Sequence, residues 1–461
     1  MIDSMLISLR NQGLDFLPRF YRLALSSALS NMMVPLAGLC DVAFLGHLTD
    51  IRYLAGVILG SILFDYLYRV LKFLRNSANA ITAQAVGRDD QQGVLLAGLR
   101  SGLIALGIAV LILLLQYPIQ KLGFALLSGS PTVESIGVDY FNARIWGAPA
   151  VLLNFVLFGW FLGQEKTGIV LLVSAVGNGS NVLLDYLMIS RWGWGSVGSG
   201  WATAISQYLA LLINLTIIGG TIQWPLLNQV RKNLLDWRAI RSSLMFKTNI
   251  LIRFIVLISV YAIFTNLSAM LGTETLAENG LMLQVALLSQ FTVNGFGLTT
   301  QTLVGNFKGQ GEYQQIQSVM IADFSKSLIF ALGFALTTVL LPKTVFGLLT
   351  NHAEVSQELI HYTIWLLPLL TVTSIAFMLE GFFVGVKQTN ILRNAALISS
   401  FAGFLPSAIA GYILQNNHLL WASLVGYMTL LVLILSGELF RFRGLKIPTT
   451  NPPYHSQSSH N

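Results

Sequence analysis

The sequence predicts an all-α membrane protein with twelve transmembrane helices in two six-helix lobes related by an internal repeat. Three observations predict this fold: the composition, the spacing of the long apolar runs, and a pattern that recurs at a fixed offset. Of the 461 residues, 54% are hydrophobic and only 10% are charged, and the mean hydropathy is +0.68. A soluble protein carries about 25% charged residues, so the composition excludes the soluble globular class.

Twelve apolar runs are long enough to cross a bilayer, which takes about 20 mostly apolar residues. We expect helices at 20–45, 54–86, 94–115, 135–162, 168–190, 199–222, 249–271, 276–307, 318–341, 356–386, 394–414 and 418–440. Several are longer than one crossing requires, so we expect them to tilt or to project beyond the lipid.

The 27 Lys and Arg residues are divided unequally between the two sides of this predicted membrane. If the termini are cytoplasmic, 18 of the basic residues lie on the cytoplasmic side and 4 in outer loops. The remaining five lie within predicted helices: Arg69, Lys72, Arg75, Arg144 and Arg253. Basic residues concentrate on the cytoplasmic side of membrane proteins, so we expect a multi-pass protein of the cell membrane with both termini in the cytoplasm. This topology accounts for the net charge of +7 without nucleic-acid binding.

The predicted connection from 223 to 248 lies near the middle of the chain and mixes Trp, Leu and Arg. This mixture is typical of an amphipathic segment on a membrane surface. It divides the chain into an N-terminal lobe (1–222), a cytoplasmic linker (223–248), a C-terminal lobe (249–440) and a polar tail (441–461) that we expect to be disordered. Charges are scattered before the first apolar run and no small-residue cleavage site precedes it, so we expect no removable signal peptide.

The two predicted lobes share short patterns at an offset of 222 residues. GWFLGQEKT (159–167) lies over GFFVGVKQT (381–389) with four identical residues, and AQAVG (83–87) lies over GNFKG (305–309) with only the final glycine identical. Because each lobe has an even number of helices, both lobes cross the membrane in the same direction. This predicts a pseudo-two-fold axis along the membrane normal and a cavity between the lobes, the architecture of alternating-access transporters.

Four stretches carry a resemblance to a known family. They are SNMMVPLAGLCDVAFLGHL (30–48), FLRNSANAITAQAVG (73–87), VLFGWFLGQEKT (156–167), and NVLLDYLMI (181–189) followed by GWATAISQY (200–208). Together they resemble the multidrug and toxic compound extrusion family, in particular its DinF-like branch, over nearly the whole chain. The resemblance implies a twelve-helix exporter driven by a proton or sodium gradient that expels amphiphilic, often cationic compounds.

Asp185 is a single carboxylate in an otherwise apolar stretch of the fifth predicted helix. At mid-bilayer such a residue costs about 2.5–3.5 kcal/mol, and it therefore faces a cavity or a partner and commonly marks an ion pathway. Asn178, Asn181 and Asp185 follow the spacing i, i+3, i+7 and share one helix face. The amides can bond either protonation state of the carboxyl group or supply oxygen ligands. The alternative is that they tie membrane helices together.

Asp41 lies six residues after Pro35, and a proline within a helix removes a backbone hydrogen bond and allows bending. The resemblance implies that Asp41 and Asp185 form a cation site in the N-terminal lobe. Two close carboxyl groups would titrate as a coupled pair, and we expect protonation to bend the first helix and shrink the pocket. The alternative is that Asp41 is merely solvated. The resemblance also implies neighbouring polar positions at Asn181, Thr203 and Asn154.

The second lobe does not repeat this carboxylate, since Ser407 lies at the position equivalent to Asp185. We expect Glu380 to be its one buried acid. The resembled branch carries an acid there, which implies a substrate or cation contact, with a structural role as the alternative. Asn294 and Gln301 lie in the eighth helix where related sequences often carry acids, and this departure argues against a proton site in the second lobe.

Arg69, Lys72 and Arg75 recur every third residue in the second helix, and Asp65 lies one turn before Arg69. Three cations facing lipid would be very costly, so they must line water, pair with acids or reach the membrane surface. We favour a charge network with Asp65. An anionic or zwitterionic substrate is the alternative.

Several function classes are excluded or disfavoured. The sequence has no Walker A pattern, no His/Glu metalloprotease motif and no GxSxG elbow, so we expect neither direct use of ATP nor an enzyme. The single cysteine, Cys40, excludes an intrachain disulfide and cysteine-rich metal sites. We expect no cofactor besides the coupling ion, H⁺ or Na⁺, and a monomer that handles a small amphiphilic substrate in the lipid bilayer. The main hypothesis is secondary-active efflux, and the alternatives are a flippase or scramblase for lipid-linked precursors, an organic-anion exporter, and a receptor that transports nothing.

Overall fold

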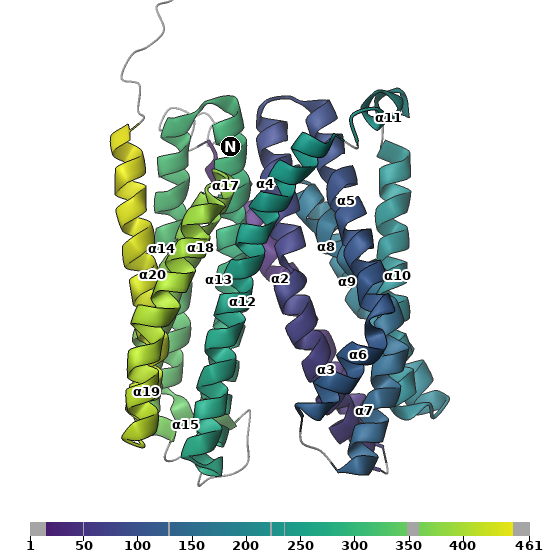
Figure 1. Ribbon diagram of the computed structural model, residues 1–461, viewed down its shortest axis with the longest axis vertical. Coiled ribbons are helices and arrows are strands. Elements are labelled where there is room, and N and C mark those ends of the chain that lie inside the picture. Colours follow the sequence, from purple (N-terminus) through teal and green to yellow (C-terminus); the bar gives the residue numbers. More distant parts are fainter. Residues whose placement is uncertain are drawn as a thin grey trace, which may run out of the picture.

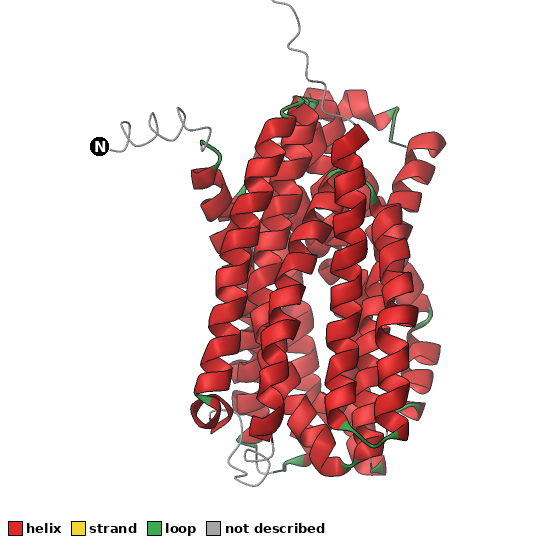
Figure 2. Ribbon diagram, turned by 90° about the vertical axis from the view of Figure 1, so that its left-hand side faces the viewer, coloured by secondary structure: helices red, strands yellow, loops and turns green. Residues whose placement is uncertain are grey.

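The computed structural model describes residues 15–445 apart from 49, 128–129, 222–223, 235 and 348–358. These residues form helices and connecting turns, with no β-strand among them (Figure 2). Within the described residues, twelve helical segments are long and apolar enough to cross a membrane. The prediction of an all-α membrane protein with twelve spans is confirmed.

The first lobe contains α2 (Leu17–Gly46), α3 (Arg52–Leu71), α4 (Phe73–Gly87), α5 (Gln91–Leu114), α6 (Gln116–Ala125), α7 (Pro131–Arg144), the 3-10 turn η1 (Ile145–Gly147), α8 (Ala148–Gly163), α9 (Thr167–Asp185), the π-helix η2 (Tyr186–Arg191) and α10 (Gly195–Thr221). The short helix α11 (Trp224–Arg231) follows it. The second lobe contains α12 (Trp237–Leu271), α13 (Thr273–Gln310), α14 (Tyr313–Leu340), α15 (Pro342–Gly347), the 3-10 helix η3 (Ile360–Trp365), α17 (Leu366–Gly385), α18 (Thr389–Ile398), the π-helix η4 (Ser399–Phe404), α19 (Leu405–Ile413) and α20 (Asn417–Leu445).

Most predicted ends differ from the structure by a few residues, and two of the differences change the predicted division of the chain. Helix α12 begins at Trp237 instead of residue 249, because 237–248 contains no glycine or proline that would stop a helix. Only the part of the predicted linker before α12, which contains α11, can therefore lie along the membrane surface. Likewise α20 continues to Leu445, so the first five residues of the predicted disordered tail are helical. The rest of that tail, the N-terminal 14 residues and the predicted start of the tenth helix lie outside the described residues.

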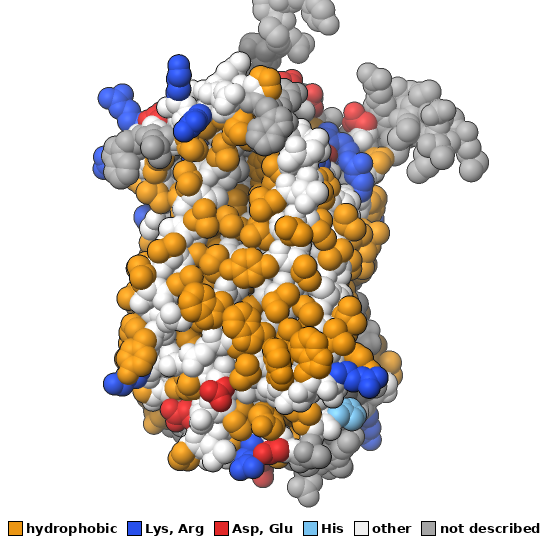
Figure 3. All heavy atoms as spheres, turned by 90° about the vertical axis from the view of Figure 1, so that its right-hand side faces the viewer, with side chains coloured by type: hydrophobic (Ala, Val, Ile, Leu, Met, Phe, Trp, Pro, Cys, Tyr) orange, Lys and Arg blue, Asp and Glu red, His pale blue; other side chains and the backbone are white. Residues whose placement is uncertain are grey.

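The outer surface has the distribution of side chains expected of a protein in lipid. Figure 3 shows a broad hydrophobic band with the charged side chains gathered toward the two ends of the molecule. Large apolar side chains in the spans point outward, for example Leu212 and Leu433, each 62% exposed. Lipid tails solvate these groups, while the helices satisfy the backbone hydrogen bonds within the bilayer.

The internal repeat is visible in the backbone turns. Three pairs of residues, each pair separated by 222 positions, adopt a positive φ where one span turns into the next. The φ angles are 53° and 81° for Asp89 and Gly311, 59° and 60° for Glu165 and Lys387, and 70° and 49° for Gly193 and Gln415. Non-glycine residues rarely adopt this left-handed conformation, so its recurrence at one offset supports the duplicated-lobe fold.

The two lobes meet where the weakly matched repeat segments cross. A Cβ atom on Gly87 of α4 would lie 2.0 Å from the carbonyl oxygen of Asn306, and one on Gly309 of α13 would lie 2.6 Å from that of Gln84. The contact is thus nearly symmetric, and both glycines allow close backbone approach. In Figure 1 the lobes come together toward the upper end, where α4 and α13 end, and diverge toward the end where α7 and α15 lie.

Candidate functional site

A cavity of about 1140 Å³ lies between the two lobes. Its wall on the side of the second lobe is mainly apolar and comes from α13 and α14, with Phe291, Phe330 and Phe334 among its residues. The charged residues of the wall all belong to the first lobe: Asp41, Asp65, Arg69, Lys72, Arg75 and Arg144. The volume slightly exceeds that of ordinary ligand pockets, and the cavity can therefore hold an amphiphilic molecule.

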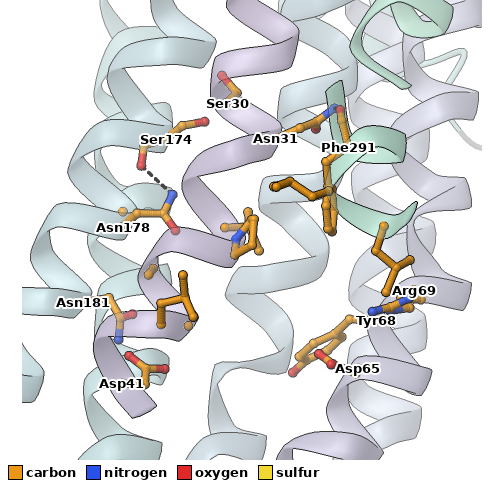
Figure 4. A pocket seen from close by; sticks show the side chains of 18 of the residues that line it. Ser30, Asn31, Asp41, Asp65, Tyr68, Arg69, Ser174, Asn178, Asn181 and Phe291 are labelled. Atoms are coloured by element: carbon orange, nitrogen blue, oxygen red, sulfur yellow. Dashed lines mark hydrogen bonds between the residues drawn. The ribbon is translucent and has the colours of Figure 1, made fainter. Parts of the chain in front are cut away.

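Asp41 and Asp185 lie on the neighbouring helices α2 and α9, and their carboxyl groups interact with each other. Figure 4 shows Asp41 beside Asn181 at one side of the cavity. Asp185 is fully buried. Both of its carboxylate oxygens, and one of the two of Asp41, lack a hydrogen-bond donor among the described residues. Buried oxygens of this kind are normally satisfied, so these atoms are available for a proton, a cation or water.

Local backbone features place these two acids. Helix α9 passes into the π-helical turn η2 directly after Asp185, and such turns are frequent at functional sites because they re-aim side chains. Pro35 lies inside α2, upstream of Asp41, and cannot donate a hydrogen bond to the preceding turn. Both acids therefore lie next to a point where the helix departs from regular α geometry.

The predicted amide and hydroxyl side chains differ in whether they already donate a hydrogen bond. Asn181 Nδ2 is buried without an acceptor. Asn178 donates to the Ser174 carbonyl of its own helix (2.7 Å, Figure 4), and Thr203 donates to the Ser199 carbonyl (3.1 Å). Among these residues Asn181 alone has a free amide group next to the carboxyl pair.

Asn154 is engaged in ties between α8 and α10. It donates to the Gln207 carbonyl oxygen (2.9 Å) and accepts from Asn214 Nδ2 (3.0 Å). Its side chain is only 2% exposed. This arrangement matches the alternative role of membrane asparagines as links between helices.

Arg144 of α7 is a residue that the sequence analysis placed in a helix without a role. Its guanidinium donates a hydrogen bond to the Tyr140 hydroxyl and lies 4.6 Å from the ring centroid of Phe64. It also interacts electrostatically with both Asp41 and Asp185. The signal in the sequence was a lone arginine within an apolar span, but its direction could not be deduced from spacing alone.

The three basic residues of the second span, which consists of α3 and α4, all line the cavity. No ion pair joins them to Asp65 in the described part of the chain. Lys72 Nζ lies 5.5 Å from the ring centroid of Phe291 in the opposite lobe. Arg75 donates to two amide oxygens, of Asn31 at 3.0 Å and of Asn294 at 3.5 Å. The expected charge network with Asp65 thus includes no direct ion pair among the described residues, although Asp65 acts electrostatically on Lys72.

Glu380, Asn294 and Gln301 come together in the second lobe around a separate cavity of about 20 Å³. Arg253 of α12 lines the same cavity and forms a buried ion pair with Glu380, whose side chain is 12% exposed. A carboxylate whose charge is already balanced does not call for a second cation. Asn294 also reaches the main site through Arg75, which no sequence spacing indicated.

Glu380 is not the one buried acid of the second lobe, as we expected from the sequence. Asp323 of α14 is fully buried and accepts a hydrogen bond from Thr300 Oγ1 (2.5 Å), and Glu278 of α13 is 6% exposed. The prediction was wrong because both acids lie near the ends or polar faces of predicted spans, where burial depends on the neighbouring helices.

A second set of polar contacts closes the end of the cavity where α4 and α13 cross. Arg19 and Glu165 form a bidentate pair, with Nε to Oε2 at 3.0 Å and Nη2 to Oε1 at 2.5 Å, and Asn306 donates to the same Oε1 (2.8 Å). Gln84 Nε2 donates to the Gly385 carbonyl (2.6 Å). The bonds from Asn306 to Glu165 and from Gln84 to Gly385 cross from one lobe to the other, so this end must separate if the cavity is to open there.

Comparisons with known proteins agree with the expected resemblance. The MatE family model matches residues 26–187 and 250–409. The chain is 31% identical to the DNA damage-inducible protein F of Escherichia coli (strain K12) over 413 residues, covering 89% of each chain. It is 24% identical to a probable multidrug resistance protein NorM of Thermotoga maritima, covering 73% of each. An outward-facing structure of a multidrug resistance MATE family transporter of the MOP superfamily superposes with a TM-score of 0.84 at 17% identity, over 93% of this chain and 96% of that one. With the family model matched in both halves of the chain, this multi-pass membrane protein belongs to the multidrug and toxic compound extrusion (MatE) family of transporters.

Proposed function

We propose that the protein exports small amphiphilic compounds by secondary-active antiport, with Asp41 and Asp185 as the site of the coupling ion. The observation that carries the proposal is the pair of interacting carboxyl groups, three of whose oxygens have no donor, beside a large cavity between two lobes. The cavity supplies the substrate site and the carboxyl pair supplies the ion site. The unequal distribution of basic residues supports cytoplasmic termini in a cell membrane.

The coupling follows from how the carboxyl pair responds to its protonation state. Two unprotonated carboxylates repel each other, whereas a proton shared between them satisfies both and brings α2 and α9 together. Because α2 contains Pro35, it can bend at that point without breaking a backbone hydrogen bond. Movement of α2 reshapes the cavity wall that contains Asp41 and so links the bound ion to the bound substrate.

We infer that the coupling ion is a proton. The positive charge of Arg144 interacts with both carboxyl groups and opposes a bound proton and a bound sodium ion alike, so the choice between the two ions depends on the oxygen ligands that the site offers. Of the predicted amide ligands, Asn154 already uses its oxygen, which accepts a hydrogen bond from Asn214 Nδ2 (3.0 Å). A proton needs only one carboxyl oxygen, whereas a sodium ion needs several oxygen ligands at once.

With cytoplasmic termini, the described form is closed toward the cytoplasm by the contacts around Glu165 and Gly87 and represents an outward-facing state. In this state protons can enter the cavity from outside, and the substrate can leave in the same direction. Return to the inward-facing state requires separation of α4 from α13.

Transport in proteoliposomes tests the proposal. Purified protein is reconstituted, a pH gradient or a sodium gradient is imposed separately, and export of the cationic dye ethidium and of a panel of amphiphilic compounds is followed. We expect accumulation that depends on the pH gradient and collapses with a proton ionophore. Accumulation driven only by sodium would refute the proton assignment, and movement of every compound independent of both gradients would refute antiport.

A further inference from the structure

The charges in the cavity wall are not balanced. Four basic residues and two acidic residues line it, and all of them come from the first lobe. Arg144 is held near Asp41 by its contacts with Tyr140 and Phe64. The unmatched positive charge is therefore concentrated at Arg69, Lys72 and Arg75, at the junction of α3 and α4.

The contacts of these three residues leave their charge uncompensated. Arg75 donates to the neutral amide oxygens of Asn31 and Asn294, and its Nε is buried without an acceptor. Arg69 and Lys72 make no hydrogen bond or ion pair with the residues that the structure describes. The nearest acid on their own span, Asp65, is exposed and acts on Lys72 only at a distance, since no ion pair or hydrogen bond joins it to these residues in the described part of the chain. Because a cation in a low-dielectric wall is costly without a counter-ion, the site is built to receive a negative charge.

The wall of the cavity opposite these basic residues is mainly apolar. The residues of α13 and α14 that line the cavity are largely apolar, including Phe291, Phe330 and Phe334. Phe291 lies next to Lys72, so the apolar wall begins directly beside the basic residues. In Figure 4 Phe291 and Arg69 lie on the side of the cavity opposite Asp41 and Asn181. A bound molecule can thus place a charged group at α3 and α4 and an apolar body against the second lobe.

We propose that the transported compounds include amphiphilic organic anions, whose carboxylate, sulfonate or phosphate group binds Arg69, Lys72 and Arg75 and whose apolar body packs against α13 and α14. This assignment rests on the proposed export function and specifies its substrate class. Arginine and lysine together suit such groups, because guanidinium forms paired hydrogen bonds and ammonium supplies a compact charge. The anion site is separate from the carboxyl pair, so substrate and proton can bind at the same time.

Direct binding tests the proposal without requiring transport. Purified protein in nanodiscs is titrated with carboxyfluorescein, an aromatic anion, and with ethidium, an aromatic cation. We expect Arg69→Gln with Lys72→Gln to weaken carboxyfluorescein binding about tenfold or more, as loss of charge-assisted hydrogen bonds implies, and to leave ethidium binding unchanged or stronger. Arg88→Gln is the matched control, because Arg88 directly follows the same membrane span (Arg52–Gly87) but is exposed and lies outside the cavity wall. Equal carboxyfluorescein binding by the double variant and the parent would overturn the proposal.

The membrane potential gives a second test. Export of an organic anion such as carboxyfluorescein against entry of one proton moves at least two positive charges inward, whereas exchange of ethidium for one proton is electroneutral. A potential that is negative on the predicted cytoplasmic side should therefore accelerate carboxyfluorescein export and leave ethidium export unchanged. If ethidium is exported but carboxyfluorescein is not, the anion assignment alone is overturned. If neither compound is exported in response to a gradient, the export function is refuted, and the binding experiment still decides whether the anion site exists.

A third arm distinguishes soluble anions from lipids. A fluorescent anionic phospholipid and a zwitterionic one are placed in one leaflet, and their movement is followed in the same vesicles. Movement of the anionic lipid that depends on Arg69 and Lys72 would assign the site to a lipid head group. Movement of carboxyfluorescein alone would assign it to soluble anions, and movement of neither anion would contradict the proposal. The conservative pair Arg69→Lys and Lys72→Arg should retain binding, which separates loss of charge from misfolding.

Discussion

The two lobes share a backbone but differ in how they hold their buried charges. In the first lobe Asp41 and Asp185 face each other with unsatisfied oxygens beside the cavity. In the second lobe Glu380 is already paired with Arg253, in a space of about 20 Å³. The turns repeat at an offset of 222 residues, while the chemistry does not. The scaffold is therefore duplicated between the lobes, whereas the interacting pair of carboxyl groups that we propose as the ion site is found in the described residues of the first lobe.

The largest expected effect is loss of coupling in the first lobe. Asp41→Asn or Asp185→Asn removes one member of the carboxyl pair, so a proton can no longer be exchanged there. We expect ethidium accumulation driven by a pH gradient to fall to the level of empty vesicles. The matched control is Asp323→Asn, since Asp323 is a fully buried acid of the second lobe that does not line the cavity. If Asp323→Asn abolished coupling and Asp41→Asn did not, the contrast between the lobes would be reversed.

A stability effect should follow from breaking the ion pair of the second lobe. Removing one partner of a buried pair leaves an uncompensated charge and costs about 3–5 kcal/mol. We expect Glu380→Gln and Arg253→Met each to lower the thermal unfolding midpoint in detergent, and Arg253→Met with Glu380→Met to recover much of the loss. The exposed pair of Glu438 and Arg441 is the control, because Arg441 is 76% exposed and Glu438→Gln should change the midpoint little.

Transport by the recovered double variant sharpens the same comparison. If the pair is structural, Arg253→Met with Glu380→Met should still exchange protons for ethidium. Loss of coupling in this folded variant would show that the second lobe also carries the coupling ion.

A methyl group added on either side of the contact between the lobes, at Gly87 or at Gly309, should disturb this contact. Gly87→Ala places a Cβ atom 2.0 Å from the Asn306 carbonyl oxygen, and Gly309→Ala places one 2.6 Å from the Gln84 carbonyl oxygen. We expect either variant to push the lobes apart at this end. In a Cys40→Ser background, spin labels at positions 88 and 313 should report longer distances.

Gly107→Ala is the control for this experiment, because no atom lies within 4 Å of a Cβ at that position. It should leave the distances unchanged and, from helix propensity, stabilise the helix by up to about 1 kcal/mol. Unchanged distances in Gly87→Ala would mean that the contact does not hold this end closed.

The smallest effect concerns the equivalent turns at Glu165 and Lys387. Glu165 is paired with Arg19, whereas burial, with Arg88 and Lys308 nearby, lowers the pKa of Lys387 to about 8. A lysine with a lowered pKa in the folded state binds its proton more tightly when unfolded, so its contribution to stability rises with pH from about 8 toward its ordinary value of 10.5. Lys387→Met should therefore raise the unfolding midpoint at pH 7, and the gain should shrink across that window. A gain independent of pH would point to packing alone.

Single charged residues in the spans could be identified from the sequence, but the residues with which they pair could not. The positions of Asp41 and Asp185 were identified because an acid in an apolar span is conspicuous and because the surrounding motifs resemble the family. The sequence shows Arg144 and Arg253 equally clearly, but it does not show their partners. Asp323 was missed because it lies near the start of its predicted span, where burial depends on the neighbouring helices. Arg253 and Glu380 are 127 residues apart, and nothing in their local sequences indicates that their helices meet.

The apolar runs and the recurring motifs along the chain were enough to predict the number and approximate length of the spans and the repeat that relates the lobes, and the distribution of basic residues indicated the orientation. These properties follow from local composition and from short patterns along the chain. Which buried charges are balanced depends on how the helices pack. Packing pairs Arg253 with Glu380, brings Arg144 near the two aspartates, and leaves Arg69 and Lys72 without an ion pair to any described residue at a cavity between the lobes. The physical reason is that the cost of a charge in the membrane depends on its nearest neighbours in space, and these are set by the packing of helices far apart in the chain.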